Sequence, residues 1–556
     1  MAVEEGAQAP VVIAGGGPVG MALAIDLALR EVPSLVLERR AEGVGFGVRT
    51  NMTNVRSMEH FRRWGIADAL RANDPVSDEI QRDVSMITRL HGGEVVLHLP
   101  RAYEWSEPLP FAAEVAEWAP NEGIEKTLRE RVAELPLIDY RHGHEVSGFT
   151  QDADGVDIVA TSPTGTLRVR AAYLVAADGS RSALRREGLN IRMEGRPDFA
   201  ASFSWHFRAP ELRELWDTGP MVSMAYFYNE DRAADIIVAQ GGTDRWQYFC
   251  GPVPEGVDGG DWEQVKAMLY RAVGAEFEAE PLDGGAFMQH SLMAPRFDFG
   301  RVALAGDAAH LVSPQGGFGM NMGIGDAADL GWKLAALVQG WGGPMLLPSY
   351  SIERREASRF ILDGCERNQE IGSPQLVRDG IEAPGPEGDE IRRAVAADIE
   401  SKKMVQFKRM GGQLGYRYAS SPIIVRDGTD APPPTFADYE PSASPGNRTP
   451  HLWMADGSSL YDHFGLGFTL LNLGDLDTGR LVAAAAERGV PLHVFVPWDD
   501  DRQPLLELYD GKSVLVRSDH HVAWRGDELP ADCDELLATV TGHHAWADDR
   551  STAAVA

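Results

Sequence analysis

The residues best suited to chemistry lie in one glycine-rich stretch, 304–321. An apolar run ending at 305 leads into a Gly-Asp pair, then three closely spaced glycines, and then a helical pattern over 323–338. Glycines let main-chain N–H groups approach a flat or anionic ligand, and the positive end of the following helix dipole would point at that ligand. A purely structural strand-to-helix turn has the same pattern, so the stretch needs support elsewhere in the chain. The residues concerned are Gly306, Asp307, Gly316, Gly317 and Gly319.

A second glycine motif lies near the start of the chain. A buried-strand pattern at 11–14 is followed by Gly15, Gly17 and Gly20 in G-x-G-x-x-G spacing, and then by an apolar helix. The next predicted strand ends in Glu38, an acid placed for a ribose hydroxyl. This is the full dinucleotide fingerprint, but it does not separate FAD from NAD. Arg39 would suit a 2′-phosphate, although a solvated charge at a strand end is the simpler interpretation.

A third predicted strand, 167–175, also ends in a polar turn, Asp178-Gly179, with Arg181 and Arg185 after it. The chain thus has three strand patterns that lead into glycine-containing turns.

The stretch 191–252 is rich in alternating and aromatic strand patterns, which indicate an antiparallel sheet. An aromatic face suits a planar apolar substrate, yet aromatic stripes are more often core, so no member of the set is singled out. His206 alternates away from Trp205 and is most simply a surface or internally bonded histidine. The aromatic candidates are Trp205, Tyr226, Tyr228 and Tyr248.

Composition limits the function classes. Charged residues are 24% and hydrophobic residues 44% of the 556 residues, as in globular proteins. The formal charge of −31 argues against nucleic acid as a partner, because there is no basic field to neutralise phosphates. The sequence lacks a signal-peptide pattern and a membrane-length apolar run, so a cytoplasmic protein that does not enter the membrane is expected. The cysteines, Cys250, Cys365 and Cys533, lack metal or disulfide spacing.

A proline-rich connector at 431–445 separates the last part of the chain from the rest. Beyond it the patterns predict a strand at 468–471, a helix at 476–488, a strand at 492–496, a hairpin and a final helix at 533–540. That order suggests a thioredoxin-like module. The absence of CxxC indicates that it carries out no thiol chemistry.

The three motifs, in this order and spacing, resemble the group A flavoprotein monooxygenases, the FAD-dependent aromatic hydroxylases. The resemblance covers residues 10 to about 360 and includes the segment 347–355. The C-terminal third is similar to the thioredoxin-like tail of the phenol hydroxylase branch. One departure is Asn121, where relatives commonly have glutamine facing the FAD.

The resemblance implies an α/β fold: a Rossmann-like FAD-binding domain, an antiparallel β-sheet substrate domain and a C-terminal thioredoxin-like domain. We expect the FAD-binding domain in two parts, 1–190 and 291–390, around a substrate domain at 191–290. A linker at 391–447 would lead to the thioredoxin-like domain at 448–556. The tail also implies a homodimer.

The resemblance assigns roles along the cofactor. The first glycines would hold the FAD pyrophosphate, Glu38 the adenosine ribose and Asp307 the ribityl chain, while the Asp178 motif would serve both FAD and the nicotinamide cofactor. The residues expected at FAD are Gly15, Gly17, Pro18, Gly20, Glu38, Arg39, Arg49, Asn121, Asp178, Arg185, Asp307, Pro314, Gly316, Gly317, Gly319, Met320 and Asn321.

The implied reaction uses NAD(P)H to reduce the flavin and O₂ to form a C4a-hydroperoxide, which hydroxylates a phenolic or polycyclic aromatic substrate. Water must be excluded, which suits a pocket between the FAD domain and the aromatic sheet. A base that deprotonates the phenol is expected. The catalytic candidates are His206, Tyr226, Tyr228 and, beside the flavin, Pro314.

Two alternatives remain open. The first keeps the cofactor but inserts oxygen next to a carbonyl of a polycyclic ketone, as Baeyer–Villiger enzymes do. The second is an FAD-carrying interaction protein whose tail is the functional surface.

Overall fold

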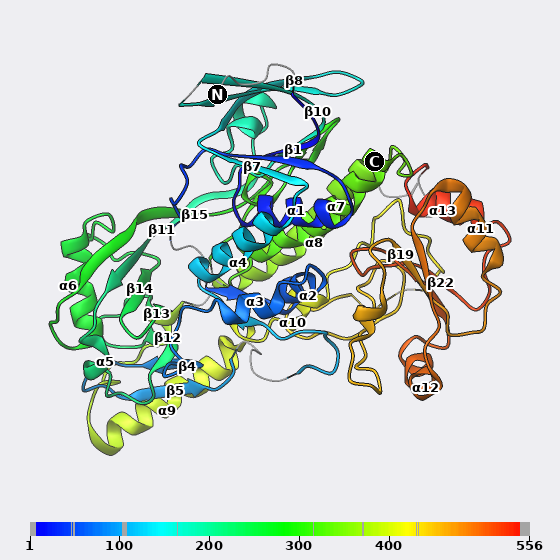
Figure 1. Cartoon of the computed structure of the whole chain (residues 1–556). Coiled ribbons are helices and arrows are strands. Elements are labelled where there is room, and N and C mark those ends of the chain that lie inside the picture. Colours follow the sequence, from blue (N-terminus) through cyan, green and yellow to red (C-terminus); the bar gives the residue numbers. More distant parts are fainter. Residues whose placement is uncertain are drawn as a thin grey trace, which may run out of the picture.

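The structure, a computed structural model, describes residues 7–45, 47, 51–102, 108–163, 165–314, 316–369, 372–429, 431 and 433–544. It contains two large sheets and a smaller C-terminal sheet, with long helices between them (Figure 1). In the same view the C-terminal part lies at the right, beside helices α7 and α8.

The first sheet has a parallel core built around β1. Strand β1 pairs in parallel with β2 and β10, β2 with β7, and β10 with β17. An antiparallel arm, β8 and β9, extends from β10, and the short β16 closes the other edge. The strands are β1 (Ala7–Ala14), β2 (Ser34–Glu38), β7 (Ile138–His142), β8 (Glu145–Gln151), β9 (Val156–Ser162), β10 (Gly165–Ala176), β16 (Asp298–Phe299) and β17 (Val302–Leu304).

Helix α1 (Pro18–Leu29) begins immediately after the first glycine turn. Pro18 occupies its first turn, where a missing N–H costs nothing, and every residue from 20 to 28 is buried. The helix packs against α7 (Gly319–Gln339), and a Cβ at Gly323 would lie 2.4 Å from Val19. This close approach of two helices brings the N-terminal and the central glycine motifs into one layer.

The second sheet has eight strands in the order β18-β15-β11-β14-β13-β12-β4-β5. Neighbours are antiparallel except β12 and β4, which are parallel. Two of its strands come from residues 81–99, outside the range 191–290 from which we expected the sheet, because β4 of their hairpin pairs with β12 and extends the sheet beyond it. The strands are β4 (Gln81–Ile87), β5 (Val95–Leu99), β11 (Glu194–Arg208), β12 (Val222–Phe227), β13 (Asp235–Gly241), β14 (Arg245–Cys250), β15 (Glu280–Met293) and β18 (His310–Leu311).

The helices around these sheets include one that the sequence patterns missed, α6 (Trp262–Val273), whose Trp262 packs on Trp205. The short strands β3 (Met52–Thr53) and β6 (Glu117–Trp118) pair with each other. The remaining helices are α2 (Val55–Arg63), α3 (Ala67–Ala72), α4 (Asn121–Glu134), α5 (Leu212–Leu215), α8 (Leu346–Gln369), α9 (Gly385–Lys402) and α10 (Met410–Leu414).

The segment 391–447, expected as a linker, differs from a simple spacer. It begins inside helix α9, and its later residues include the buried side chains Arg409, Gln413 and Tyr418. Buried polar groups need partners, so this segment is packed into the molecule through specific contacts.

The C-terminal sheet has the strand order β20-β19-β21-β22, with β19 parallel to β20 and antiparallel to β21. The patterns found its elements except α12, a helix that contains Pro504. The elements are β19 (Phe468–Leu471), α11 (Gly479–Arg488), β20 (Leu492–Phe495), α12 (Asp499–Leu508), β21 (Ser513–Val516), β22 (Val522–Gly526) and α13 (Cys533–Val540).

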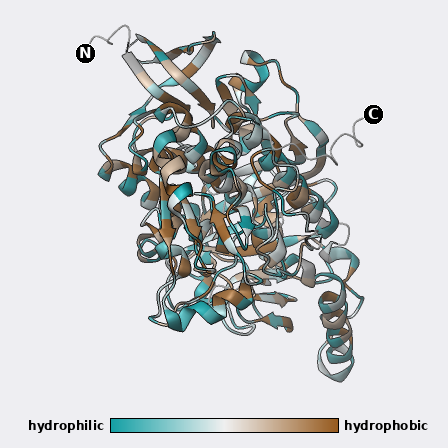
Figure 2. Cartoon of the chain, turned by 90° about the vertical axis from the view of Figure 1, so that its right-hand side faces the viewer, coloured by the Kyte–Doolittle hydropathy of each residue, from teal (hydrophilic) through white to brown (hydrophobic). Residues whose placement is uncertain are grey.

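Hydrophobic residues are distributed through the strands and helices in the middle of the molecule, as Figure 2 shows. Across the described ranges, no helix combines the length and the apolar character needed to cross a membrane.

Candidate active site

The three sequence motifs meet at one edge of the first sheet. Strands β1, β10 and β17 are neighbours, and each motif follows the carboxyl end of its strand. Ala177 donates its N–H to the carbonyl of Ala14, and Ala305 donates to the carbonyl of Ala176, so the three turns start at the same level. The three turns therefore lie side by side at one edge of the sheet.

Gly15 lies where no other residue fits. Its φ is +106°, and a side chain would place Cβ 2.3 Å from the carbonyl oxygen of Ala177. In the first turn of α1, a Cβ at Gly20 would lie 2.0 Å from the carbonyl oxygen of Gly15. Because no side chain stands at these two positions, the main-chain N–H groups at the start of α1 are open to a ligand. Binding of a pyrophosphate requires such open groups.

Glu38 ends β2 at the same edge and is buried. Its Oε2 accepts the Gly16 N–H at 2.8 Å, and its Oε1 accepts the Arg40 N–H at 2.8 Å. Arg39, in contrast, is exposed, and it makes a loose 3.9 Å ion pair with Glu145. Of this pair, Glu38 is therefore the residue held in place at the glycine turn.

Asp178 has a carboxylate oxygen that finds no hydrogen-bond partner in the part of the chain that the structure describes. Among the described residues, its buried Oδ1 has no hydrogen bond, and burial raises the pKa of its carboxyl group. Arg185 is buried nearby and donates to the carbonyls of Ala308 and Ser180, at 3.1 and 3.0 Å. Arg185 thus joins the second and third motifs, while Asp178 remains available to a ligand.

Asp307 lies in a 3₁₀ turn, Gly306–Ala308, whose main chain is hydrogen-bonded to helix α7. Gly306 has φ +61° and donates its N–H at 2.9 Å to Asp326 of α7. Asp326 is fully buried and also accepts from His310 at 2.7 Å and from Arg354 at 2.8 Å. The backbone of this turn is therefore fixed by a buried carboxylate, and Asp307 itself is only partly buried.

The glycine turn before α7 leaves the start of that helix open. Gly316 and Gly317 have φ of +98° and +63°, and the N-cap residue, Phe318, provides no side-chain hydrogen bond to the helix. The uncapped N–H groups carry the positive end of the helix dipole. Pro314 is exposed, and Gly319 and Met320 are partly exposed, so this end of α7 is accessible.

Asn321 ties the turn to the neighbouring strand β3. Its side-chain amide donates to the carbonyls of Met52 and Gly317, at 3.1 and 2.7 Å, and its oxygen accepts the Asn54 N–H at 2.9 Å. Sequence placed Asn321 along the flavin; here its side chain is used to fix the backbone that would border the ring. Arg49 lies outside the described residues.

The second sheet separates its candidate residues by face. Pairing across β11, β14, β13 and β12 places one set of side chains on the face turned toward β3 and the glycine turn, which we call the inner face. Gln247 accepts from Asn51 at 3.0 Å, and Gln289 accepts from Ser313 at 3.1 Å, which joins this face to the first sheet's loops. The inner face includes Ser204, His206, Tyr226, Ile236, Val238, Gln240, Gln247 and Phe249.

The remaining aromatic candidates lie elsewhere. Trp205 and Tyr248 pair with each other on the opposite face, and Trp205 donates to the Gly259 carbonyl at 2.9 Å. Tyr248 is fully buried and donates to Asp235. Tyr228 follows β12 and is also fully buried. Tyr226 is the one aromatic candidate of the four on the inner face, and its hydroxyl accepts from Gln406 at 2.7 Å.

His206 opens into a cavity of about 470 Å³ between the second sheet, helix α4 and the loop residues 43–45 and 47. Its buried Nε2 lacks a hydrogen-bond partner within the described part of the chain. Burial, reinforced by Arg245, lowers the pKa of His206 below its ordinary value, which keeps the imidazole neutral and able to accept a proton. The cavity is lined by Gly45, Gly47, Asn121, Glu122, His206 and Gln240, among others.

Family models match most of the chain. The model described as FAD binding domain covers residues 8–364, and the one described as aromatic-ring hydroxylase, C-terminal, covers 442–544. The chain belongs to the FAD-dependent aromatic-ring hydroxylases.

Relatives of this hydroxylase match over nearly their whole length. It is 31% identical to the FAD-dependent monooxygenase apdD of Emericella nidulans, over 97% of this chain and 92% of the relative. It is 29% identical to a putative polyketide hydroxylase of Streptomyces halstedii, over 96% of this chain and 95% of the relative. The chain is thus an FAD-dependent aromatic monooxygenase, and NAD(P)H is the reductant typical of its family.

Solved structures show the same mixed α/β flavoprotein fold. RebC soaked with chromopyrrolic acid, with bound 7-carboxy-K252c, is 35% identical with a TM-score of 0.87, covering 97% of this hydroxylase and 99% of RebC. Aklavinone-11 hydroxylase in complex with FAD and aklavinone is 27% identical with a TM-score of 0.80, covering 96% and 99%.

The three motifs meet at one edge of the first sheet, which we call the motif edge. Its residues have the chemistry needed to bind FAD. A bare glycine turn, a carboxylate at the end of β2, the unpartnered oxygen of Asp178 and the open N-terminus of α7 follow one another along the edge. Sequence reasoning missed the buried supports, Asp326, His310 and Arg354, because their partners lie far away in sequence. It also missed the amides Gln240 and Gln247, which strand alternation from His206 could have indicated.

Proposed function

We propose that this monooxygenase hydroxylates a phenolic or polyketide-type polycyclic aromatic substrate bound against the inner face, in the cavity that His206 and Gln240 line together with α4. The cavity of about 470 Å³, which His206 shares with Asn121 from the opposite side, is the observation that carries this proposal. The face mixes apolar side chains such as Val238 with amide groups such as Gln247, which suits a flat ring system bearing oxygen substituents. Aklavinone in a similar solved structure supports this substrate class.

We propose that the residues along the motif edge bind FAD in chain order. Gly15, Gly17, Pro18 and Gly20 form the pyrophosphate turn, and Glu38 the ribose contact. Asp178 and Asp307 supply carboxylates, and the inner edge is formed by Asn121, Pro314, Gly317, Gly319, Met320 and Asn321. When bound, FAD reduced by NAD(P)H activates O₂ and supplies the oxygen atom.

The chain's own groups have separable tasks in this proposal. The positive end of α7 stabilises negative charge beside it, at the N–H groups of Gly319 and its neighbours. His206 accepts the phenolic proton on Nε2, which makes the ring a better nucleophile. Tyr226, fixed by Gln406, borders the substrate without moving a proton.

Replacing Asp307 with alanine tests the cofactor assignment. The turn itself is held through the main chain of Gly306, so the variant should fold yet lose FAD. The measurement is the flavin absorbance per protein after purification. Stoichiometric FAD in Asp307→Ala would overturn the assignment.

NAD(P)H oxidation against a panel of phenols and polycyclic aromatics tests the reaction. The proposal expects that at least one polycyclic phenol accelerates oxidation and is converted to a hydroxylated product. No acceleration across the panel by FAD-loaded protein would contradict it.

We also propose a domain organisation and assembly. The FAD-binding domain comprises 1–190 and 291–390, with 191–290 as most of the substrate domain. The strand order β20-β19-β21-β22 with α11 and α13 supports a thioredoxin-like domain at 448–556. Its exposed Val496 and Trp498, each 51% exposed, offer an apolar surface for a homodimer, which light scattering would measure. The unlinked thiols suit a cytoplasmic location.

A further inference from the structure

The hairpin loop between β21 and β22 is buried although all its residues are polar. Each of residues 517–521 is at most 3% exposed. Hairpin loops normally lie at the surface, where water satisfies their polar groups. This loop also contains His520 with φ +62°, a conformation that side chains other than glycine rarely adopt. A buried, polar and locally strained loop needs an extensive set of partners.

Those partners come from the FAD-binding part of the chain. Arg517 donates to Glu353 of α8 at 2.6 Å and to Asp329 of α7 at 2.8 Å. From α2, Arg56 donates to the Asp519 carbonyl at 2.5 Å, and Arg63 donates to the Ser518 carbonyl. The loop is therefore inserted among three helices that belong to the opposite domain.

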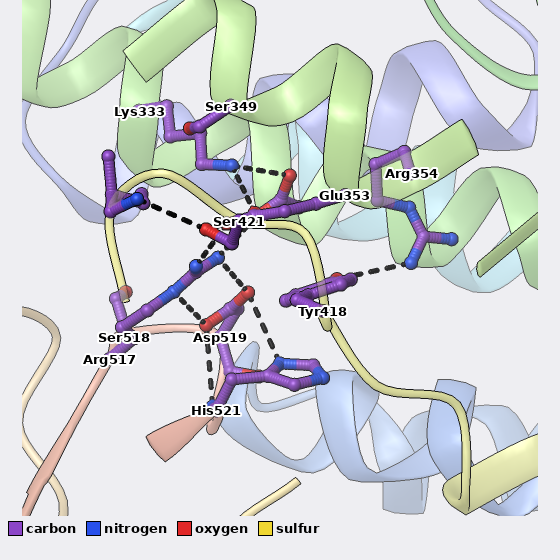
Figure 3. A network of polar contacts seen from close by, with 12 residues as sticks. Lys333, Ser349, Glu353, Arg354, Tyr418, Ser421, Arg517, Ser518, Asp519 and His521 are labelled. Atoms are coloured by element: carbon purple, nitrogen blue, oxygen red, sulfur yellow. Dashed lines mark hydrogen bonds and ion pairs between the residues drawn. The ribbon is translucent and has the colours of Figure 1, made fainter. Parts of the chain in front are cut away.

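The inserted charges form a closed cluster (Figure 3). Arg517 also binds Asp519 of its own loop at 2.7 Å, and Lys333 binds both Asp329 and Glu353, at 2.9 and 2.5 Å. Three carboxylates thus face two cations. Burial raises the pKa of Asp329, although the nearby cations Lys333 and Arg517 act in the opposite direction. Such a cluster is stable in one arrangement only, because any member that lost its partner would be an uncompensated buried charge.

A second set of contacts leads from the loop toward the Gly306–Asp307 turn. Arg517 lies over the ring of Tyr418 at 5.2 Å, and His521 stacks on the same ring at 4.1 Å. The Tyr418 hydroxyl accepts from Arg354 at 3.2 Å. Arg354 binds Asp326, which in turn accepts the N–H of Gly306. Each step is a direct contact between buried groups.

We propose that the loop 517–521 positions the FAD site: it holds Tyr418 and Arg354 so that Asp326 fixes the Gly306–Asp307 turn. Tyr418, Arg354 and Arg517 are thus positioning residues that never touch the cofactor. The C-terminal domain, which has no thiol pair, acts by completing the turn that binds FAD. This inference rests on the proposed role of Asp307.

Tyr418→Phe is the mildest test, because it removes only the hydroxyl that accepts from Arg354. The dissociation constant for FAD should rise about threefold to tenfold, because the turn that binds FAD feels only part of the loss of this hydrogen bond. Tyr509→Phe is the matched control: Tyr509 is also fully buried and donates to the Pro450 carbonyl within the C-terminal part. Its variant should lower Tm without changing the FAD dissociation constant. Equal FAD affinities in the two variants, measured well below Tm, would overturn the proposal.

Arg517→Lys keeps the charge but removes the forked contacts, and Arg488→Lys does the same at an exposed pair with Asp534. The first should weaken FAD binding and the second should not. If Asp307→Ala keeps FAD, the assignment of the turn itself fails. If Asp307→Ala loses FAD while Tyr418→Phe and Arg517→Lys bind it normally, only the positioning role fails.

Discussion

Two titratable residues of the second sheet have opposite surroundings because strand alternation places them on opposite faces. His206 faces the cavity and has an unpartnered Nε2, whereas Asp235 faces the core and bonds only to Tyr248 among the contacts described for its carboxylate. Burial acts on both, lowering the pKa of His206 and raising that of Asp235 to about 6. His206 is therefore suited to catalysis, whereas burial of the Asp235 carboxylate lowers the free energy of unfolding.

Replacing His206 with glutamine should lower kcat about 100-fold with the best phenolic substrate, because the proton acceptor is lost. FAD content should not change. His98→Gln is the control, since His98 bonds to Ser85 and Asp83 away from the cavity. Because the pKa of His206 is lowered, wild-type kcat should stay level at neutral pH and fall only in acid. A normal kcat for His206→Gln would rule out its role as base.

Asp235→Asn should stabilise the protein at pH 8. The folded pKa of about 6 exceeds the ordinary 3.8, so the wild type loses stability as pH rises from about 4 to 6 and regains none above. The amide avoids this loss and still accepts from Tyr248, so the gain should be about 1–3 kcal/mol at pH 8 and vanish below about pH 4. Thermal unfolding at both pH values measures it, and a pH-independent difference would refute the explanation.

At the scale of elements, helix α7 connects the motif edge with the rest of the molecule. Its open first turn follows Gly317, and its later turns carry Asp326 and Asp329, which bind partners from other parts of the chain. The helix position therefore depends on the glycine turn at one end and on buried ion pairs further along.

Gly317→Ala should destabilise the apoprotein by about 1–2 kcal/mol, because φ is +63° there and a Cβ would meet Met52 at 3.2 Å. Gly319→Ala is the matched control: its Cβ would make only an ordinary 3.7 Å contact with Val312. Denaturant unfolding of the two apoproteins compares them. Equal effects would show that backbone strain is not what requires glycine at 317.

At the scale of the whole molecule, the sequence predicted the local elements better than the contacts between domains. The glycine motifs, the alternating strands of β11 to β14 and the C-terminal pattern at 468–540 were all recognisable, because each depends on neighbouring residues. The parallel pairing of β12 with β4 and the burial of 517–521 were not, because they depend on partners far away in sequence. Charged residues in a hairpin loop, such as those of 517–521, normally indicate that the loop is exposed to solvent.

The same buried charges predict how the molecule responds to acid. Burial alone would raise the pKa values of Glu59 and Glu353, but Arg448 and Arg56 act on the first, and Arg517 and Lys333 on the second, and bring both to about 2. Depressed pKa values give stability that is present above about pH 4.5 and is lost as pH falls toward 2, up to about 3 kcal/mol for each group.

Unfolding monitored from pH 6 to pH 2 should therefore show a steep loss of stability below about pH 4.5. Glu59→Gln should be less stable at pH 6 and should have a flatter acid profile, because the group that titrates is gone. If the acid profile of Glu59→Gln is identical to that of the wild type, the Glu59–Arg448 ion pair does not have this role.

The mass of the product formed from ¹⁸O₂ in the presence of NAD(P)H tests the central claim most directly. The protein, loaded with FAD and given a polycyclic phenol that it oxidises, should incorporate one ¹⁸O atom as a ring hydroxyl, with the carbon skeleton intact. An unlabelled product, or ¹⁸O inserted next to a carbonyl as a ring ester oxygen, would contradict hydroxylation.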